Sequence, residues 1–240
     1  MKTNSTSENS RDYLIAGMFS KIAPFYDFLN HFLSMGIDIY WRKRLIKLIE
    51  PSQKSPIFLD LATGTMDVAR EIEKKFRDNG GFICGIDLSF KMLSLGKKKI
   101  NKSTISPVCA NAKKLPIKNF SVDFVTIAFG IRNINPRSNT YKEVLRVLKP
   151  GGKFLILEFG STQKKILFGL YNLYLNHLLP RIGNLISKDP GAYTYLSETI
   201  KKFPMAEKLQ MELVEAGFRD VSYIPLTFGI VNLYTATAPK

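Results

Sequence analysis

The segment that most constrains this chain is Ile57-Phe-Leu-Asp-Leu-Ala-Thr-Gly-Thr-Met-Asp-Val-Ala-Arg70. Its first five positions are mostly apolar, as in a buried strand, and small residues follow up to Thr65. From Val68 onwards the apolar residues take helical spacing. The segment therefore predicts a strand, a tight turn and the start of a helix, where free backbone N–H groups can face a ligand.

An acid stands at the position where a nucleotide site needs one. A second apolar run over residues 82–86 ends at Asp87, 23 positions after Gly64. In nucleotide-binding βαβ units a carboxylate about 20 residues beyond the turn accepts hydrogen bonds from ribose hydroxyls. The Gly-x-Gly-x-x-Gly pattern is absent, because Gly64 is the one glycine of the turn. A βαβ unit without a ligand therefore remains the alternative at this point.

Strand and helix patterns alternate through the first two thirds of the chain. Further strands are expected over residues 105–109, 122–129 and 153–159, and helices over residues 67–76, 89–99 and 140–148. A sharp turn at Pro150-Gly-Gly152 precedes the last of these strands. A helix over residues 204–216 is followed by strands over residues 221–226 and 230–237, whose short link predicts antiparallel pairing. The pattern predicts a mostly parallel sheet with helices on both faces.

The 240 residues are expected to form one domain, residues 13–240, after a polar, disordered tail over residues 1–12. Residues 13–50 predict a helical extension, punctuated by Pro24 and Gly36. Residues 161–210 predict a helical cover over the substrate side. Polar residues interrupt the apolar stretch over residues 166–186, so no transmembrane helix is expected.

The net charge of +15 favours an anionic partner, whether nucleic acid, anionic lipid or an acidic metabolite. Nucleic acid is not expected, because the basic residues form no stripe interleaved with aromatic residues. Around Trp41, an amphipathic helix with Lys43 and Lys47 on its polar face either shows them to water or rests on a membrane surface. The two cysteines and two histidines indicate a reducing compartment and no metal site. We expect a cytoplasmic protein with peripheral contact at the inner face of the membrane.

Short motifs along almost the whole chain, about residues 15–238, resemble those of the menaquinone/ubiquinone C-methyltransferase family. These motifs are Phe25-Tyr-Asp27, Asp60-Leu-Ala-Thr-Gly-Thr65, Gly85-Ile-Asp-Leu-Ser89, Ala110-Asn-Ala112 with Leu115-Pro116, Ala128-Phe-Gly-Ile-Arg-Asn133, Leu148-Lys-Pro-Gly-Gly152, Leu157-Glu-Phe159, Leu179-Pro-Arg-Ile-Gly183 and Tyr193-x-Tyr195-Leu-x-Glu198-x-Ile200. The resemblance implies a Rossmann-like class I methyltransferase fold, with a seven-stranded, mostly parallel sheet and one antiparallel strand. It also implies S-adenosylmethionine as cofactor and S-adenosylhomocysteine as product.

The resemblance implies a set of cofactor-binding residues at the strand ends. They are Asp60, Gly64, Thr65, Asp87, Leu88, Asn111, Ala112 and Ala128. Asp87 can accept from both ribose hydroxyls, and Asn111 can offer its amide to the adenine edge. Ala128 offers no side-chain contact where some members carry serine. Met66 stands where the family usually has glycine, so we expect it to crowd the methionine end of the cofactor or to rearrange the turn.

The catalytic residues that the resemblance implies are Arg132, Asn133 and Tyr26. The implied reaction is C-methylation of a polyprenylated quinol, either demethylmenaquinol or a 2-methoxy-6-polyprenyl-1,4-benzoquinol. Arg132 would stabilise the developing phenolate as a fixed cation, while Tyr26 or Asn133 holds the oxygen. Arginine is a poor base, so the proton acceptor stays open, with His177 as one candidate.

Three other readings stay open beside this one. The acceptor could be another lipophilic phenol or a sterol-like molecule. The charge suggests nucleic-acid methylation, although no Asn/Asp-Pro-Pro-Tyr/Phe motif is present. If Met66 blocks the cofactor, the chain would be a non-catalytic relative that scaffolds quinone enzymes. A homodimer is compatible with all of these readings.

Overall fold

The computed structural model describes residues 3–51, 53–100, 104–160 and 190–240. Helices and strands follow in the order α1 (Thr3–Leu33), α2 (Ile37–Lys47), β1 (Ile57–Leu61), α3 (Asp67–Phe76), β2 (Phe82–Asp87), α4 (Phe90–Lys97), β3 (Ile105–Cys109), β4 (Val122–Ala128), α5 (Arg137–Val147), β5 (Leu148–Phe159), α8 (Pro190–Lys202), α9 (Ala206–Glu215), β6 (Arg219–Leu226) and β7 (Val231–Thr237). Short 3₁₀ turns, η1 (Arg77–Asn79), η2 (Ile131–Asn133) and η4 (Thr227–Gly229), lie between them.

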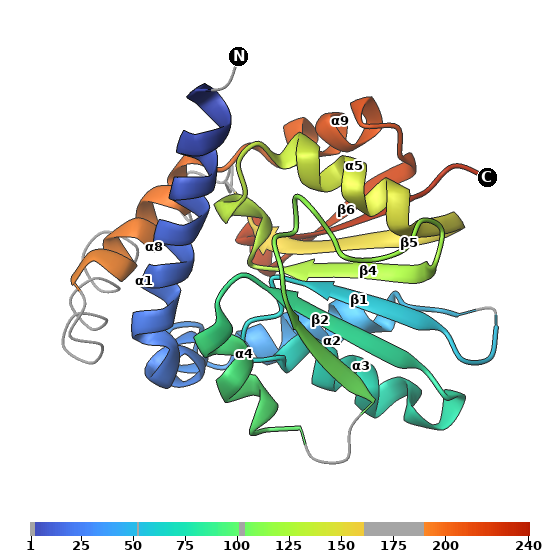
Figure 1. The fold of residues 1–240 in the computed structure, drawn as a ribbon, viewed down its shortest axis with the longest axis horizontal. Helices are drawn as coiled ribbons and strands as arrows, with labels where there is room; N and C mark the ends of the chain where they lie inside the picture. The colour runs from blue at the N-terminus through green and yellow to red at the C-terminus, as the bar shows by residue number, and fades with distance from the viewer. Residues whose placement is uncertain (1–2, 52, 101–103, 161–189) are drawn as a thin grey trace.

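The strands form one sheet in the order β3-β2-β1-β4-β5-β7-β6 (Figure 1). Strand β7 runs antiparallel to both of its neighbours, and the pairs among β1 to β5 are parallel. The predicted mostly parallel sheet with one antiparallel strand is confirmed. The chain leaves β1 toward one edge of the sheet and β4 toward the other. Ligands of doubly wound sheets bind beyond such a switch point, at the carboxyl ends of the strands.

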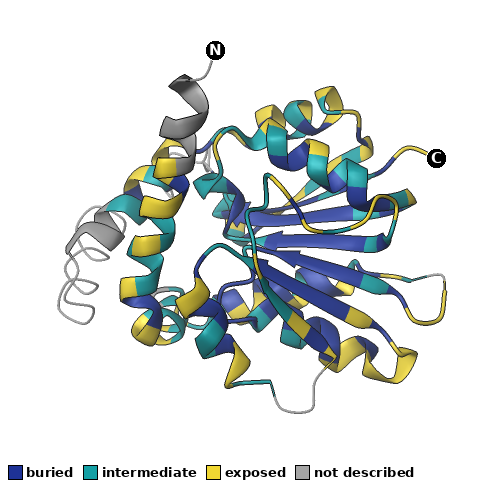
Figure 2. Ribbon diagram, in the orientation of Figure 1, coloured by how far each residue is buried: buried dark blue, intermediate teal, exposed yellow. Residues whose placement is uncertain are grey.

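Alternate strand residues point to opposite faces of the sheet, and helices cover both faces, so the central strands are buried on both sides (Figure 2). On one face Leu59 and Ile127 belong to a cluster with side chains of α5 and α9. On the other face Phe58 and Phe124 pack with side chains of α2 and α3. Burying each large apolar side chain contributes about 1.5–3 kcal/mol, so these two clusters hold the strand ends in fixed positions.

Helix α1 does not cover either face of the sheet. It crosses the carboxyl ends of the strands, beside α8 (Figure 1). It contacts α4, α2 and α8. Because it stands at the ligand end of the sheet, its inner residues form the wall opposite the strands.

Two expectations for the N-terminal region need correction. Helix α1 begins at Thr3, so residues 3–12 are helical and not the disordered tail that the polar composition suggested. Pro24 lies inside this helix and does not end it. Pro24 is exposed, so water can take the place of the N–H that proline lacks. Gly36 does separate the helices: it has φ 77° just before α2 begins.

The turn expected at Pro150-Gly-Gly152 is part of β5, which starts at Leu148. The register of β5 on β4 shifts between the Val122 and Phe124 pairs, and Gly151 has φ 76°. These residues therefore form an irregularity within the strand. Of the cover expected over residues 161–210, residues 161–189 lie outside the described residues. The described part contains α8, and α9 packs on the sheet face instead.

Candidate active site

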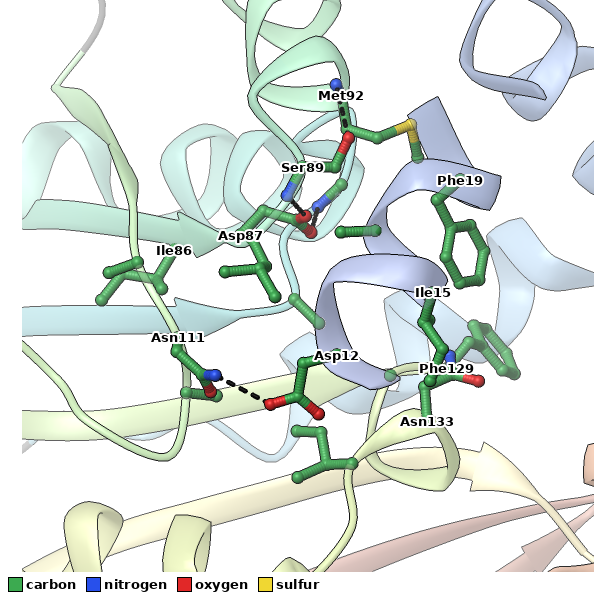
Figure 3. A pocket seen from close by; sticks show the side chains of 18 of the residues that line it. Asp12, Ile15, Phe19, Ile86, Asp87, Ser89, Met92, Asn111, Phe129 and Asn133 are labelled. Carbon is green, nitrogen blue, oxygen red and sulfur yellow. Dashed lines mark hydrogen bonds between the residues drawn. The ribbon is translucent and has the colours of Figure 1, made fainter. Parts of the chain in front are cut away.

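A cleft that is open to solvent lies between α1 and the carboxyl ends of the parallel strands (Figure 3). It is lined by Asp12, Ile15, Ala16, Phe19, Tyr26, Ala62, Gly64, Ile86, Asp87, Leu88, Ser89, Met92, Ala110, Asn111, Ala112, Lys113, Ala128, Phe129, Gly130, Asn133 and Ile134. Six of the residues expected to bind the cofactor are among them: Gly64, Asp87, Leu88, Asn111, Ala112 and Ala128. Tyr26 and Asn133 also line it.

The β1–α3 turn leaves the cleft clear of Met66. Its backbone is left-handed, with φ 68°, and its side chain is fully buried in the core cluster that contains Trp41 and Leu93. The expected crowding of the cofactor is therefore wrong, because this backbone turns the side chain into the core. A left-handed conformation costs a non-glycine residue about 1–2 kcal/mol, which the buried contacts offset.

The turn is tightly packed against α4 at Gly96. A β-carbon there would lie 2.9 Å from both Cγ of Met66 and the carbonyl carbon of Thr65. We expect Gly96→Ala to destabilise the protein by about 1–3 kcal/mol and to weaken cofactor binding, because the backbone of the turn must move. Urea unfolding measures the first effect. Gly17→Ala is the matched control: a β-carbon there meets nothing within 4 Å, so stability should hold or rise. Equal stability of the two variants would contradict this packing.

Asp87 is fixed at the end of β2 by two backbone donors. Gly64 N–H donates to its Oδ2 at 2.9 Å and Ser89 N–H to its Oδ1 at 2.8 Å. Burial raises the pKa of this carboxyl, against the lowering effect of these hydrogen bonds. Each oxygen keeps lone pairs for further donors. The carboxylate is thus oriented into the cleft as a pair of acceptors, which fits a ribose diol.

Asn111 lies at the other side of the cleft and contacts α1. Its Nδ2 donates to Oδ2 of Asp12 at 2.9 Å, while its Oδ1 accepts from the N–H of Lys113 at 2.9 Å (Figure 3). Asp12 also pairs with Nζ of Lys113 at 2.6 Å. The amide expected to meet adenine is therefore engaged by Asp12. Local sequence patterns cannot predict this contact, because Asp12 is 99 positions from Asn111 in the chain.

Asp60 and Thr65 are not part of the cleft lining. Asp60 is buried beneath the turn and accepts from the hydroxyls of Thr63 and Thr126, each at 2.6 Å. Burial raises the pKa of Asp60 to about 6. Thr65 is also buried, and its hydroxyl donates to Asp27 of α1. Both residues support the turn from below, and neither is among the residues that line the cleft.

Arg132, which was expected to act as a fixed cation, is paired with an acid and does not line the cleft. Its side chain is 5% exposed, and its Nη1 lies 3.0 Å from Oε1 of the fully buried Glu158. Its backbone N–H donates to the other oxygen of Glu158 at 3.2 Å, and its guanidinium lies over the Phe159 ring. Nη1 also donates to the carbonyl of Phe129. Glu158 largely compensates the charge of Arg132, and the pair fixes the β4–η2 connection.

Tyr26 and Asn133 are the polar groups that face the cleft near this pair. Burial raises the pKa of Tyr26, and the nearby charges of Arg132 and Arg42 oppose that shift. Tyr26 is therefore a neutral hydroxyl at physiological pH. Oδ1 of Asn133 accepts from the hydroxyl of Tyr195 on α8 at 3.0 Å, which leaves the Asn133 amide N–H groups to donate. His177, the candidate base, lies outside the described residues.

Glu158 and Tyr195 were not identified as functional residues from the sequence, although both lie within quoted motifs. An acid inside the apolar run at residues 154–159 was the available signal for Glu158. An acid buried in a strand needs a charged or hydrogen-bonded partner, and here that partner is Arg132.

The residues present fit S-adenosylmethionine. The cleft is bounded by a paired acceptor at Asp87, by a turn with Gly64 at φ 56°, and by apolar side chains, while Met66 points elsewhere. A sheet of this order, with this cleft at its switch point, is the fold of class I S-adenosylmethionine-dependent methyltransferases.

Comparison with known proteins gives the family. The profile of the ubiE/COQ5 methyltransferase family matches residues 4–238, and the chain belongs to that family. It is 42% identical over 225 residues to the Geobacter sulfurreducens protein named "Ubiquinone/menaquinone biosynthesis C-methyltransferase UbiE", covering 92% of this chain and 87% of that one.

Solved structures with lower identity share the fold. Haemonchus contortus phosphoethanolamine N-methyltransferase 2, in complex with S-adenosylhomocysteine, aligns with TM-score 0.61 and 16% identity, over 83% of this chain and about half, 52%, of that one. The [4+2]-cyclase SpnF aligns with TM-score 0.67 and 15% identity, over 94% and 95% of the two chains. A methyltransferase and a cyclase thus share this architecture, so the acceptor must be argued from the site.

Proposed function

We propose that this protein transfers a methyl group from S-adenosylmethionine to a ring carbon of a polyprenylated quinol, demethylmenaquinol or a 2-methoxy-6-polyprenyl-1,4-benzoquinol. The observation that supports the proposal most is the make-up of the cleft. Two neutral donors, Tyr26 and Asn133, face it beside the apolar side chains of Ile15, Phe19 and Phe129. This combination suits an aromatic ring with one hydroxyl and an oily substituent. The name of the Geobacter sulfurreducens relative agrees with it.

When bound, the cofactor supplies a sulfonium-activated methyl group. The protein's part is to bind the sugar through Asp87 and to hold the ring in line through its oxygen. Tyr26 and the Asn133 amide donate hydrogen bonds to that oxygen, which carries negative charge once its hydroxyl proton has left and passes electron density to the ring carbon that attacks the methyl group. Donors held in fixed positions stabilise such charge better than mobile solvent does, because they need no reorganisation during the reaction.

The Arg132–Glu158 pair acts from behind these donors. Nε of Arg132 is buried and has no hydrogen-bond partner in the described part of the chain. A buried N–H left without an acceptor costs about 1–3 kcal/mol, which a bound oxygen or water would recover. We assign Arg132 to stabilising the phenolate and Glu158 to holding the guanidinium in place.

The test is methyl transfer from labelled S-adenosylmethionine to each quinol, reduced and dispersed in detergent, with a simple phenol and a sterol as comparison acceptors. We expect label on at least one polyprenylated quinol and little on the comparison acceptors. A thermal-shift titration with the cofactor runs in parallel, since a ligand of the native state raises its stability. Cofactor binding without label on either quinol would overturn the substrate assignment, and absence of any thermal shift would favour a non-catalytic scaffold.

We propose a cytoplasmic location with peripheral contact at the inner membrane face, where a polyprenylated quinol would reside. Within the described residues, no helix has both the length and the apolarity needed to cross a bilayer. Nucleic acid is not part of the proposal.

A further inference from the structure

Helix α1 is apolar on two opposite faces. Ile15, Phe19 and Tyr26 face the cleft. At the same helical spacing on the far side stand Leu14, Phe25, Phe28 and Phe32, with side chains 75%, 43%, 57% and 50% exposed. A surface helix of a globular protein ordinarily has one apolar stripe, facing the core. In the part of the chain that the structure describes, the residues of the second stripe are exposed.

The outer face of α1 is defined as Leu14, Lys21, Phe25, Phe28 and Phe32, continued by Met35, which is 82% exposed. Phe28 and Phe32 stack with ring centroids 5.7 Å apart. Exposed residues run yellow along α1 in Figure 2. This much contiguous exposed aromatic surface marks an interaction site.

Along residues 10–47, which hold most of α1 and all of α2, the exposed charged residues have one sign. Between residues 10 and 47, the charged residues that the structure shows as exposed are Arg11, Lys21, Lys43 and Lys47.

Each acid of the same span is paired; Asp12 and Asp38 are buried, and the side chain of Asp27 is 34% exposed. Asp12 pairs with Lys113, Asp27 with Lys99 and Asp38 with Arg42. An exposed surface of aromatic and basic residues without acids is typical of helices that lie in the interface of an anionic membrane.

We propose that the outer face of α1 docks on an anionic lipid surface, with the aromatic side chains entering the headgroup region. A second copy of the chain is disfavoured, because two such faces would bring like charges together. Residues 161–189 carry four basic residues, Lys164, Lys165, Arg181 and Lys188, against Asp189, so their charge does not complement this face either.

The placement gives α1 a double role, which rests on the proposed quinol substrate. Its inner face lines the cleft and its outer face contacts lipid, so the two environments are separated by the thickness of one helix, about 10 Å. A quinol whose isoprenoid tail stays in the bilayer can then place its ring in the cleft by passing the edge of α1.

The experiment is co-sedimentation of the full chain with vesicles of phosphatidylcholine containing about one third phosphatidylglycerol, at roughly 0.15 M salt. We expect wild-type protein to bind these vesicles, and to bind pure phosphatidylcholine or vesicles in high salt less. The double variant Phe28→Asp/Phe32→Asp should lower the partition coefficient at least about tenfold, because it removes two aromatic anchors and adds two negative charges.

Met211→Asp is the matched control, since Met211 is 61% exposed on helix α9, which packs on the sheet away from α1. The partition coefficient of Met211→Asp on anionic vesicles should equal that of the wild-type protein. Methylation of a water-soluble, short-chain quinol should be unchanged in both variants, whereas methylation of a long-chain quinol in vesicles should fall for the double variant alone.

Equal binding to anionic and neutral vesicles, or an equal loss in the control, would overturn the proposal. The proposal would also be overturned if light scattering showed a wild-type dimer that the double substitution dissociates, with little vesicle binding by either protein. If the wild-type protein does not bind vesicles, the proposal is also refuted, and an acidic protein becomes the candidate partner of the outer face of α1. Because sedimentation needs neither cofactor nor quinol, its outcome is independent of the proposed reaction.

Discussion

Arg132→Ala is expected to lower the turnover number for quinol methylation by about 100-fold or more, because it removes the positive charge that we assign to stabilising the phenolate from behind Tyr26 and Asn133. It also leaves Glu158, fully buried, without its cation. A buried charge deprived of its partner destabilises a protein by about 3–5 kcal/mol. Steady-state kinetics with both substrates measures the first effect and urea unfolding the second. Activity within about threefold of wild type would refute the assigned role.

Two further variants separate catalysis from folding. Arg132→Ala/Glu158→Ala removes both charges, so stability should recover toward wild type while activity stays low. Glu158→Gln leaves the charge of Arg132 uncompensated. A freely acting cation would then stabilise the phenolate as well or better. If the pair works as a positioned unit, turnover should instead fall about tenfold with the KM for cofactor unchanged.

Asp87→Asn is expected to raise the dissociation constant for S-adenosylhomocysteine by about 100-fold, since hydrogen bonds to a charged acceptor contribute about 1.5–3 kcal/mol each. The amide keeps the size of the carboxylate, but one of its two ends becomes a donor and faces the N–H of Gly64 or Ser89. Isothermal titration calorimetry measures the affinity directly. An unchanged dissociation constant would remove Asp87 from the ribose site.

Asp123→Asn is the matched control. Asp123 accepts the N–H of Ile57 at 2.8 Å and pairs with Lys149, but at the opposite, amino end of the strands. Both aspartates therefore support the sheet through backbone hydrogen bonds, and both substitutions should cost some stability. Only the change at Asp87 should alter cofactor affinity. A similar loss of affinity in both variants would show that the effect at Asp87 is indirect.

Local patterns in the sequence were sufficient for most of the fold. The strand, turn and helix from Ile57 were predicted with the bounds that β1 and α3 have in the structure. The helix expected from residue 89 is α4, and Ser89 caps it, because its side chain accepts from the N–H of Met92. Such features depend on residues a few positions apart, so short-range spacing encodes them. Where the local signal misled, at Pro24 and at Pro150-Gly-Gly152, packing and sheet pairing outweighed the preference for a break.

In the candidate active site, too, the sequence determines some features and only the tertiary structure determines others. The sequence by itself determined the positions at the strand ends, Gly64, Asp87 and Asn111, because an alternating α/β chain must bring the carboxyl ends of its strands to one edge. Only the tertiary structure decided which way Met66 points, that Glu158 compensates Arg132, and that Asp12 of α1 holds Asn111. These contacts join residues far apart in the chain, and a buried charge or amide takes its partner from whatever the fold places beside it.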